Sequence, residues 1–337
     1  MRSLKDSYQR AIDYLRVSIT DRCNLRCIYC MSSEGLIPLE HKEILRYEEI
    51  IRVVSIAAET GLRKVRITGG EPLVRKNVTY LISALRDIEA IKDLSLTTNG
   101  ILLSGYADKL AEAGLKRINI SLDSLRPDRY KEITRGGDLN LVLKGIKAAE
   151  KAGLTPVKIN MVPIRGLNND EVEDFAKLTL KLPYQIRFIE FMPFGTEGLW
   201  SPERFISVEE IKAIVETVAP LIPAKMKRSG PARYFRFDNA TGVIGFISPI
   251  SNHFCGECNR LRLTADGKLR PCLFSETEID LKPALRGGAP DDEIERLIKL
   301  SIEVKPKGHD IGTSNPELWA LMKNKECARR PMSRIGG

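Results

Sequence analysis

Strand-like and helix-like segments alternate along the first 195 residues, and this alternation restricts the fold more than any other feature of the chain. Short apolar runs rich in branched residues take turns with amphipathic helical patterns. The predicted strands are 15–20, 64–68, 94–98, 117–122, 156–161 and 185–191, and the predicted helices lie near 47–60, 77–88, 103–113, 139–152 and 168–181. Strands joined by helices pair in parallel through right-handed crossovers. The pattern therefore predicts an α/β fold, an incomplete TIM-like (β/α)6 barrel whose open side needs covering.

After about residue 220 the alternation gives way to hairpin signals. The runs 234–237 and 243–247 flank a turn-forming segment at 238–242, and the runs 261–264 and 268–270 flank Asp266-Gly267. A further helix is expected near 290–301. We therefore predict a barrel over residues 1–220 and a smaller α+β domain over residues 221–337.

Composition and charge narrow the class of protein. The 337 residues are 43% hydrophobic and 29% charged, which is ordinary for a soluble globular chain. No apolar run approaches a membrane span and no signal peptide is evident, so we expect a cytoplasmic protein without a membrane partner. The net charge of +9 suggests anionic partners. Lysines and arginines scattered over solvated helix faces account for most excesses of this kind. No polybasic tail or aromatic-basic interleaving occurs, so nucleic acid is not favoured, and a polyphosphate substrate fits the charge equally well.

Three cysteines lie close together directly after the first predicted strand. Cys23, Cys27 and Cys30 have the spacing C-x3-C-x2-C. Three thiolates are one fewer than a closed zinc or iron–sulfur site uses, and the open position is where a substrate or cofactor can bind. A zinc knuckle or a set of buried thiols is the alternative, although the nearest histidine, His41, lies in another segment.

A second incomplete triplet occurs in the hairpin region. Cys255, Cys258 and Cys272 have the spacing C-x2-C-x13-C. His253 stands two residues before the first of them, so a Cys3His zinc site is chemically allowed. Two groups of three cysteines do not form a disulfide framework, and we expect the seventh, Cys327, to be a free thiol.

Polar and glycine residues follow several of the predicted strands, where barrels of this kind place their binding residues. The second strand leads into Gly69-Gly70-Glu71-Pro72, whose glycines allow close approach of a ligand and whose carboxylate could accept from an ammonium. Ser121 ends the fourth strand and Met192 follows the sixth. Each has a simpler interpretation, as a glycine turn, a helix N-cap or a core methionine.

The first triplet, with Tyr29 just before its last cysteine, resembles the signature of radical S-adenosylmethionine (SAM) enzymes. In that superfamily the three cysteines hold a [4Fe–4S] cluster and SAM chelates the fourth iron. The resemblance implies SAM contacts at four positions: Tyr29, Gly70, Ser121 and Met192.

With the second triplet and the arginines that follow it, nearly the whole chain resembles the GTP 3′,8-cyclase family of molybdenum cofactor biosynthesis. The resemblance implies a second [4Fe–4S] cluster on Cys255, Cys258 and Cys272, whose open iron binds the guanine of GTP. It also implies that GTP is contacted by Arg16, Arg66, Thr97, Lys158, Arg260, Leu261 and Arg262. The family ends in a twin glycine that enters the active site and is needed for activity, here Gly336-Gly337, so the implied catalytic residues are Arg16, Arg260, Arg262, Gly336 and Gly337.

The resemblance further implies the reaction and the partners. One electron from a flavodoxin- or ferredoxin-type donor leads to SAM cleavage, hydrogen abstraction from C3′ of GTP and closure onto C8, giving (8S)-3′,8-cyclo-7,8-dihydroguanosine 5′-triphosphate. A homodimer and delivery of the product to cyclic pyranopterin monophosphate synthase are also expected. Two alternatives remain from the residues: a radical SAM enzyme acting on a peptide, which predicts more C-terminal cysteines, and a zinc-stabilised nucleic-acid-binding protein.

Overall fold

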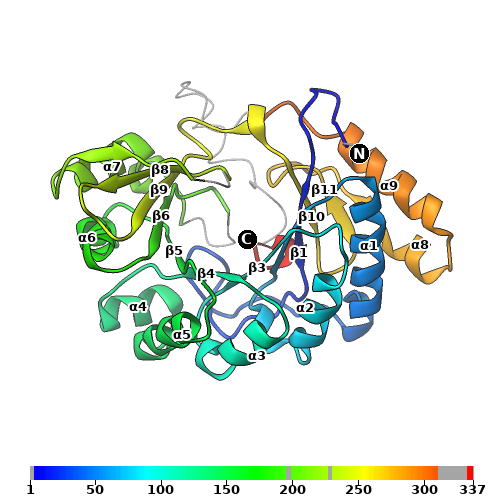
Figure 1. The fold of residues 1–337 in the computed structure, drawn as a ribbon, viewed down its shortest axis with the longest axis horizontal. Helices are drawn as coiled ribbons and strands as arrows, with labels where there is room; N and C mark the ends of the chain where they lie inside the picture. The colour runs from blue at the N-terminus through cyan, green and yellow to red at the C-terminus, as the bar shows by residue number, and fades with distance from the viewer. Residues whose placement is uncertain (1–3, 195–198, 227–229, 310–331, 337) are drawn as a thin grey trace.

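The computed structural model describes residues 4–194, 199–226, 230–309 and 332–336 (Figure 1). Its first part contains the parallel strands that the alternation predicts, each paired with the next along the chain. They are β1 (Tyr14–Ser18), β2 (Lys64–Thr68), β3 (Asp93–Thr98), β4 (Arg117–Ser121), β5 (Lys158–Met161) and β6 (Gln185–Ile189). The predicted partial barrel is therefore confirmed, with strand boundaries displaced by at most two residues.

Helices cover the outer side of the curled sheet (Figure 1). The predicted ones are α1 (Tyr47–Thr60), α2 (Val78–Arg86), α3 (Ala107–Glu112), α5 (Leu139–Lys151) and α6 (Val172–Lys181). Two more were not predicted, α4 (Pro127–Thr134) and α7 (Val208–Glu216). Both carried a usable signal, because α4 has proline at its first position and α7 begins with a capping box between Ser207 and Glu210.

Both predicted hairpins form, and each adds a strand to the parallel sheet. The C-terminal strands are β7 (Leu221–Pro223), β8 (Arg233–Phe237), β9 (Val243–Ile247), β10 (Arg260–Leu263), β11 (Lys268–Arg270) and β12 (Ile279–Asp280). β9 pairs in parallel with β6, and β10 pairs in parallel with β1. The order is β12-β11-β10-β1-β2-β3-β4-β5-β6-β9-β8-β7.

The parallel part of the sheet is thus two strands wider than the sequence pattern predicts. Hairpin signals reveal antiparallel neighbours but not the second partner of a strand, which is why these pairings were missed. β9 and β10 pair on their other sides with β8 and β11, so the barrel stays open between them. One sheet runs through both parts of the chain, and the division at 220/221 stays a prediction.

The remaining described helices are α8 (Lys282–Arg286), α9 (Asp291–Glu303) and α11 (Met332–Ile335). α9 confirms the helix expected near 290–301 and packs beside α1 (Figure 1). The described end of the chain, by contrast, lies inside the arc of strands, near β1 (Figure 1). Among the described residues, no helix combines the length and apolar character needed to cross a membrane.

Side chains alternate between the two faces of each strand, and this alternation separates a hydrophobic layer from a polar interior. On β1, Leu15 and Val17 are buried in the core between sheet and helices, whereas Tyr14 and Arg16 line the interior pocket. Successive side chains on a strand point to opposite faces, so one face can be apolar while the other carries charge. The core thereby fixes the strands, and the strands position the polar side chains of the site.

Candidate functional site

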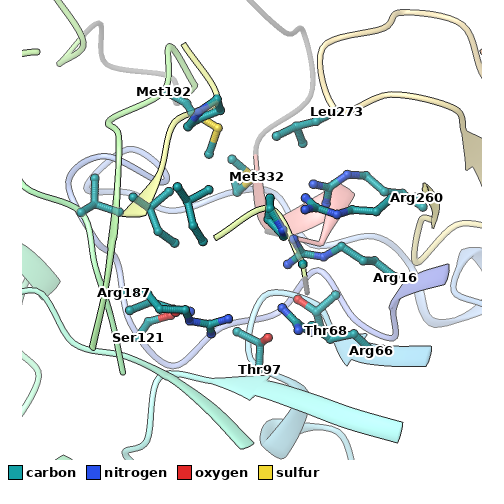
Figure 2. A pocket seen from close by; sticks show the side chains of 18 of the residues that line it. Arg16, Arg66, Thr68, Thr97, Ser121, Arg187, Met192, Arg260, Leu273 and Met332 are labelled. Carbon is teal, nitrogen blue, oxygen red and sulfur yellow. The ribbon is translucent and has the colours of Figure 1, made fainter. Parts of the chain in front are cut away.

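A pocket of about 390 Å³ occupies the interior of the open barrel and gathers most of the predicted site residues (Figure 2). Those that line it are Arg16, Cys23, Cys27, Tyr29, Cys30, Arg66, Gly70, Thr97, Ser121, Lys158, Met192, Cys255, Cys258, Arg260, Arg262 and Cys272. Leu261 is instead buried in the hydrophobic core, because it points to the opposite face of β10 from its two arginine neighbours. Leu261 is therefore not among the described residues that line the pocket.

The two cysteine triplets lie at opposite ends of the paired strands β1 and β10. Cys23 follows the carboxyl end of β1, whereas Cys258 precedes the amino end of β10. The strands are parallel, with Tyr14 opposite Arg260 and Arg16 opposite Arg262. The register therefore separates the triplets along the strand direction and places arginines between them.

The first triplet lies on a loop held against the glycines that follow β2. The Gly70 amide donates to the carbonyl of Thr20 at 2.7 Å, and a Cβ added at Gly70 would lie 2.3 Å from the carbonyl oxygen of Arg22. Only glycine permits this approach. The leading reason for Gly70 in this structure is thus packing against the cysteine loop.

The thiols of the first triplet suit a cationic metal group. Burial, reinforced by the neighbouring Cys23, raises the pKa of Cys30 to about 12, and burial also raises the pKa of Cys27 and of Cys23. The Cys23 Sγ accepts a hydrogen bond from the amide of Leu25 at 3.4 Å. Metal binding must displace protons from such thiols, and the positive charge then stabilises the thiolates. The residues present therefore fit an iron–sulfur cluster with one open iron.

Glu71 does not face the pocket, in contrast to the expectation that it could accept from an ammonium. It is only 1% exposed, and its carboxylate accepts from the Leu73 amide at 3.0 Å, the Thr98 hydroxyl at 2.8 Å and the Asn99 amide at 2.7 Å. Burial raises the pKa of Glu71 to about 7 even with these bonds. Glu71 ties the ends of β2 and β3 together.

Tyr29 is likewise engaged by the protein itself. Its hydroxyl donates to Asp123 at 2.5 Å, and the other carboxylate oxygen of Asp123 accepts from the Val162 amide at 2.9 Å. Burial raises the pKa of Asp123 to about 6. This contact anchors the cysteine loop to the ends of β4 and β5, which leaves the backbone and ring of Tyr29 to face the pocket.

Basic side chains dominate the described part of the pocket wall, where eight arginine and lysine residues face three acidic ones. Of these, Lys64 pairs with Asp13 at 2.9 Å, and Arg117 forms a close ion pair with Asp93. Figure 2 shows Arg16 and Arg260 reaching in from one side of the cavity and Arg187 from another. Such a surplus of buried positive charge is costly without an anion.

The pKa values of the basic residues report the same excess of charge. Burial and repulsion from Arg187, Arg117 and Arg66 lower the pKa of Lys158 to about 7. Burial and the neighbouring Arg260 lower the pKa of Arg262 to about 10. The site is therefore prepared for a multiply charged anion, which would relieve this repulsion.

The low pKa of Lys158 predicts pH-dependent anion binding. In the unfolded chain this amine has its ordinary pKa of 10.5, so the unfolded state binds more protons between pH 7 and 10.5, and this group's contribution to stability rises with pH there. An anion reverses the effect by returning the proton to Lys158. We expect the dissociation constant of inorganic tripolyphosphate to rise above pH 7 by up to about tenfold per pH unit.

Calorimetric titration between pH 6.5 and 8.5 tests this dependence, and Lys158→Met serves as the comparison. The variant should bind more weakly at pH 6.5 and show a flatter pH profile. If the logarithm of the dissociation constant changed with pH by the same slope in both proteins, the pH dependence would belong to the polyphosphate rather than to Lys158.

Several pocket groups lack a partner within the described residues. The buried hydroxyls of Tyr14 and Thr97 and the Nε of Arg187 make no hydrogen bond there. Buried polar atoms are normally satisfied, so orphaned ones facing a cavity indicate a ligand that completes them. Tyr14 and Arg187 were not singled out from the sequence, although Arg187 is the only charged residue of its strand.

The second triplet lies at the open end of the hairpin formed by β10 and β11, away from the turn that connects them. Cys255 and Cys258 precede β10 and Cys272 follows β11. Burial opposes ionisation of Cys258, but the cations of Lys305 and Arg260 lower its pKa overall. His253 also lines the pocket here, with its ring centroid 5.2 Å from that of His309.

In the described part of the chain, no three histidine, cysteine, aspartate or glutamate side chains are gathered tightly enough to enclose one metal ion. The fit of a cluster at either triplet therefore rests on three thiols that line one pocket, and at the second triplet also on the basic groups beside them. Basic groups near thiolates offset the negative charge of an iron–sulfur cluster.

Gly336, at the described end of the chain, contacts Arg262, one of the arginines that line the pocket. Arg262 donates through Nη1 to the carbonyl of Gly336 at 2.5 Å. Gly336 has φ +81°, and a Cβ there would lie 2.7 Å from the Thr68 side chain, so the position favours glycine on both counts. Met332, the first residue of α11, borders the cavity (Figure 2). The other predicted glycine, Gly337, and Cys327 lie outside the described residues.

Comparisons with known proteins identify the class first. The sequence model of the Radical SAM superfamily matches residues 17–179, and that of Molybdenum Cofactor Synthesis C matches residues 184–311. Among solved structures, Streptococcus suis SuiB bound to S-adenosylmethionine aligns with a TM-score of 0.59 at 15% identity, covering 94% of this chain and 73% of SuiB. Native anSMEcpe with bound AdoMet aligns with a TM-score of 0.51 at 17% identity, covering 86% and 84%. The fold is that of a radical SAM enzyme.

Curated relatives then identify the family. A GTP 3′,8-cyclase of Thermodesulfovibrio yellowstonii is 52% identical over 99% of this chain and 100% of the relative. That of Alkaliphilus metalliredigens is also 52% identical, over 99% and 100%. The chain therefore belongs to the GTP 3′,8-cyclase family, and it is a radical SAM enzyme, which implies a [4Fe–4S] cluster and SAM.

Proposed function

We propose that this protein converts GTP to (8S)-3′,8-cyclo-7,8-dihydroguanosine 5′-triphosphate, in the first step of molybdenum cofactor biosynthesis. One observation supports the proposal in addition to family membership. A single cationic pocket is lined by two incomplete cysteine triplets, which lie at opposite ends of the parallel strands β1 and β10. A site with two open metal positions can hold SAM at one end of the pocket and the substrate at the other, with the reacting groups close together between them.

The first triplet, Cys23, Cys27 and Cys30, is proposed to hold the cluster that binds SAM. When bound, that cluster would supply the electron for reductive cleavage of SAM, and SAM in turn would supply the radical that removes a hydrogen atom from the substrate. The chain's own contribution is to bind and orient SAM. Contacts are proposed from Gly70, Ser121 and Met192, and from the backbone or ring of Tyr29.

The basic residues that line the pocket are proposed to bind the triphosphate and ribose of GTP. Arg16, Arg66, Thr97, Lys158, Arg260 and Arg262 are assigned to this role, to which we add Arg187 for its unpaired buried Nε. Guanidinium groups donate in bidentate pairs to phosphate oxygens, and a trianionic or tetraanionic group offsets the repulsion that lowers the pKa of Lys158. Leu261 is retained only as a backbone contact.

A second [4Fe–4S] cluster is proposed on Cys255, Cys258 and Cys272, with the guanine at its open position. The C-terminal Gly336 and Gly337 are proposed to complete the site, which the bond from Arg262 to Gly336 supports. Flavodoxin- or ferredoxin-type electron donors, a homodimer, transfer of product to cyclic pyranopterin monophosphate synthase and a cytoplasmic location remain predictions.

An anaerobic assay with reconstituted protein, SAM and dithionite tests the proposed substrate. We expect 5′-deoxyadenosine and the cyclised nucleotide to form in equal amounts with GTP, and little of either with ATP, because the guanine-specific contact would be missing. Equal turnover of both nucleotides would contradict the assignment of guanine to the second triplet. Brown protein carrying about eight irons per chain, rather than zinc, is the accompanying expectation.

A further inference from the structure

A buried lysine lies directly behind the second cysteine triplet. Lys305 follows α9 and is only 3% exposed. Its Nζ lies 3.6 Å from the Sγ of Cys258, 2.8 Å from the carbonyl oxygen of Arg260 and 2.5 Å from the carbonyl oxygen of Pro271. These three acceptors match the three N–H groups of an ammonium, whereas a neutral amine would be one donor short. The geometry therefore fits the charged form.

This ammonium has no carboxylate partner among the described residues; its three neighbours there are the sulfur and two carbonyls. A buried charge requires an opposite charge as well as hydrogen bonds. With the proposed cluster bound, the coordinating sulfur of Cys258, 3.6 Å from the Lys305 nitrogen, would supply the opposite charge.

The chain holds Lys305 firmly in this position. Arg10 donates to the carbonyl oxygens of Cys255 at 2.7 Å, Pro306 at 2.6 Å and Lys307 at 2.8 Å. The same arginine is fixed by the buried carboxylate of Asp6 at 2.5 Å. One guanidinium thus joins the segment after α9 to the cysteine loop, and the distance from Lys305 to the triplet is built into the fold.

We propose that Lys305 is the counter-cation of the second cluster, a positioning residue whose ammonium donates to the Cys258 thiolate and makes the cluster easier to reduce. The inference rests on the proposed second cluster. Potentials of iron–sulfur clusters depend on net charge, hydrogen bonds to sulfur and solvent exposure. Reduction adds one electron, and a cation held within a few ångströms in a partly dry environment favours the state with the extra negative charge.

The test isolates the second cluster. In a parent with Cys23, Cys27 and Cys30 replaced by alanine, only the second triplet can hold a cluster, and its reduction is followed by electron paramagnetic resonance during a redox titration. Three variants are made in this parent: Lys305→Met, Lys305→Arg, and Lys307→Met as the matched control. Lys307 has the same charge two residues away but is exposed.

We expect Lys305→Met to lower the equilibrium constant for one-electron reduction about tenfold, which is a shift of about 59 mV to more negative potential. Lys305→Arg keeps the charge and should stay near the parent, as should Lys307→Met. If the methionine variant takes up no iron while the arginine variant does, the charge is needed to hold the cluster, which also supports the proposal.

A fully loaded Lys305→Met variant with the parent's potential would overturn the inference, and so would an equal shift in Lys307→Met. Loss of iron from both the methionine and the arginine variants would also overturn it, because charge would then not be the deciding property. A parent that binds no iron would instead refute the second cluster itself, so the two failures are distinguishable.

Discussion

Replacement of Cys27 by alanine is expected to abolish SAM cleavage, with 5′-deoxyadenosine formation falling on the order of 1,000-fold or more. Cys27 lines the pocket with the other two cysteines of its triplet, and burial raises its pKa well above the usual range. A thiol in such a place is stable as a thiolate only with a metal bound. Losing one of three ligands therefore removes the cluster, and with it the electron transfer on which the reaction depends.

Cys327→Ala is the matched control for this change, because Cys327 is the one cysteine of the sequence outside both triplets. It should retain full activity and full iron. The Cys27→Ala variant should keep the iron of the second triplet, about half of the total. SAM cleavage at the native rate in Cys27→Ala would contradict the assignment of the first triplet.

Replacement of Arg262 by alanine is the second large effect that we expect, a fall of about 100-fold in GTP cyclisation. Arg262 is 5% exposed, lines the pocket and donates to the carbonyl of Gly336 at 2.5 Å. Its removal deletes a charge-assisted contact proposed for GTP and also the bond that holds Gly336. SAM binding should fall much less than cyclisation, since Arg262 lies on β10, whereas Gly70, Ser121 and Met192 lie at the ends of β2, β4 and β6.

Arg236→Ala provides a control arginine at an exposed position of β8 and should leave turnover unchanged. Arg262→Lys keeps the charge but not the bidentate geometry, and it should recover part of the activity. Rates of cyclisation and of 5′-deoxyadenosine release are measured together. Normal cyclisation by Arg262→Ala would exclude the proposed GTP contact of Arg262 and any need for its bond to Gly336.

The sequence pattern predicted the layers of this fold well, because helices and strands were long enough to show their periods. Helix α1 spans 47–60 as expected, and strand β2 spans 64–68. The parallel pairing of β9 and β10 with β6 and β1 was not predictable in this way, since pairing between distant segments leaves no local signal. α4 was missed because it is short and rich in charged residues, and its strongest cue is one proline.

The candidate site was predictable where residue chemistry is distinctive and much less so where its meaning depends on neighbours. Cysteine spacing led to both triplets. Lys305 looks like a surface lysine in the run Val304-Lys305-Pro306-Lys307, and only the fold shows that its amine reaches Cys258. Glu71 illustrates the reverse case, because a carboxylate beside two glycines suggested a ligand contact that the Thr98 and Asn99 bonds already satisfy.

The most direct test of the proposed reaction uses GTP carrying deuterium at C3′. Anaerobic turnover with SAM and reductant should transfer the deuterium into 5′-deoxyadenosine, while the nucleotide product gains the bond between C3′ and C8. The C3′ hydrogen is the one that the proposed cyclisation removes. Unlabelled 5′-deoxyadenosine, released while GTP is recovered intact, would contradict the account.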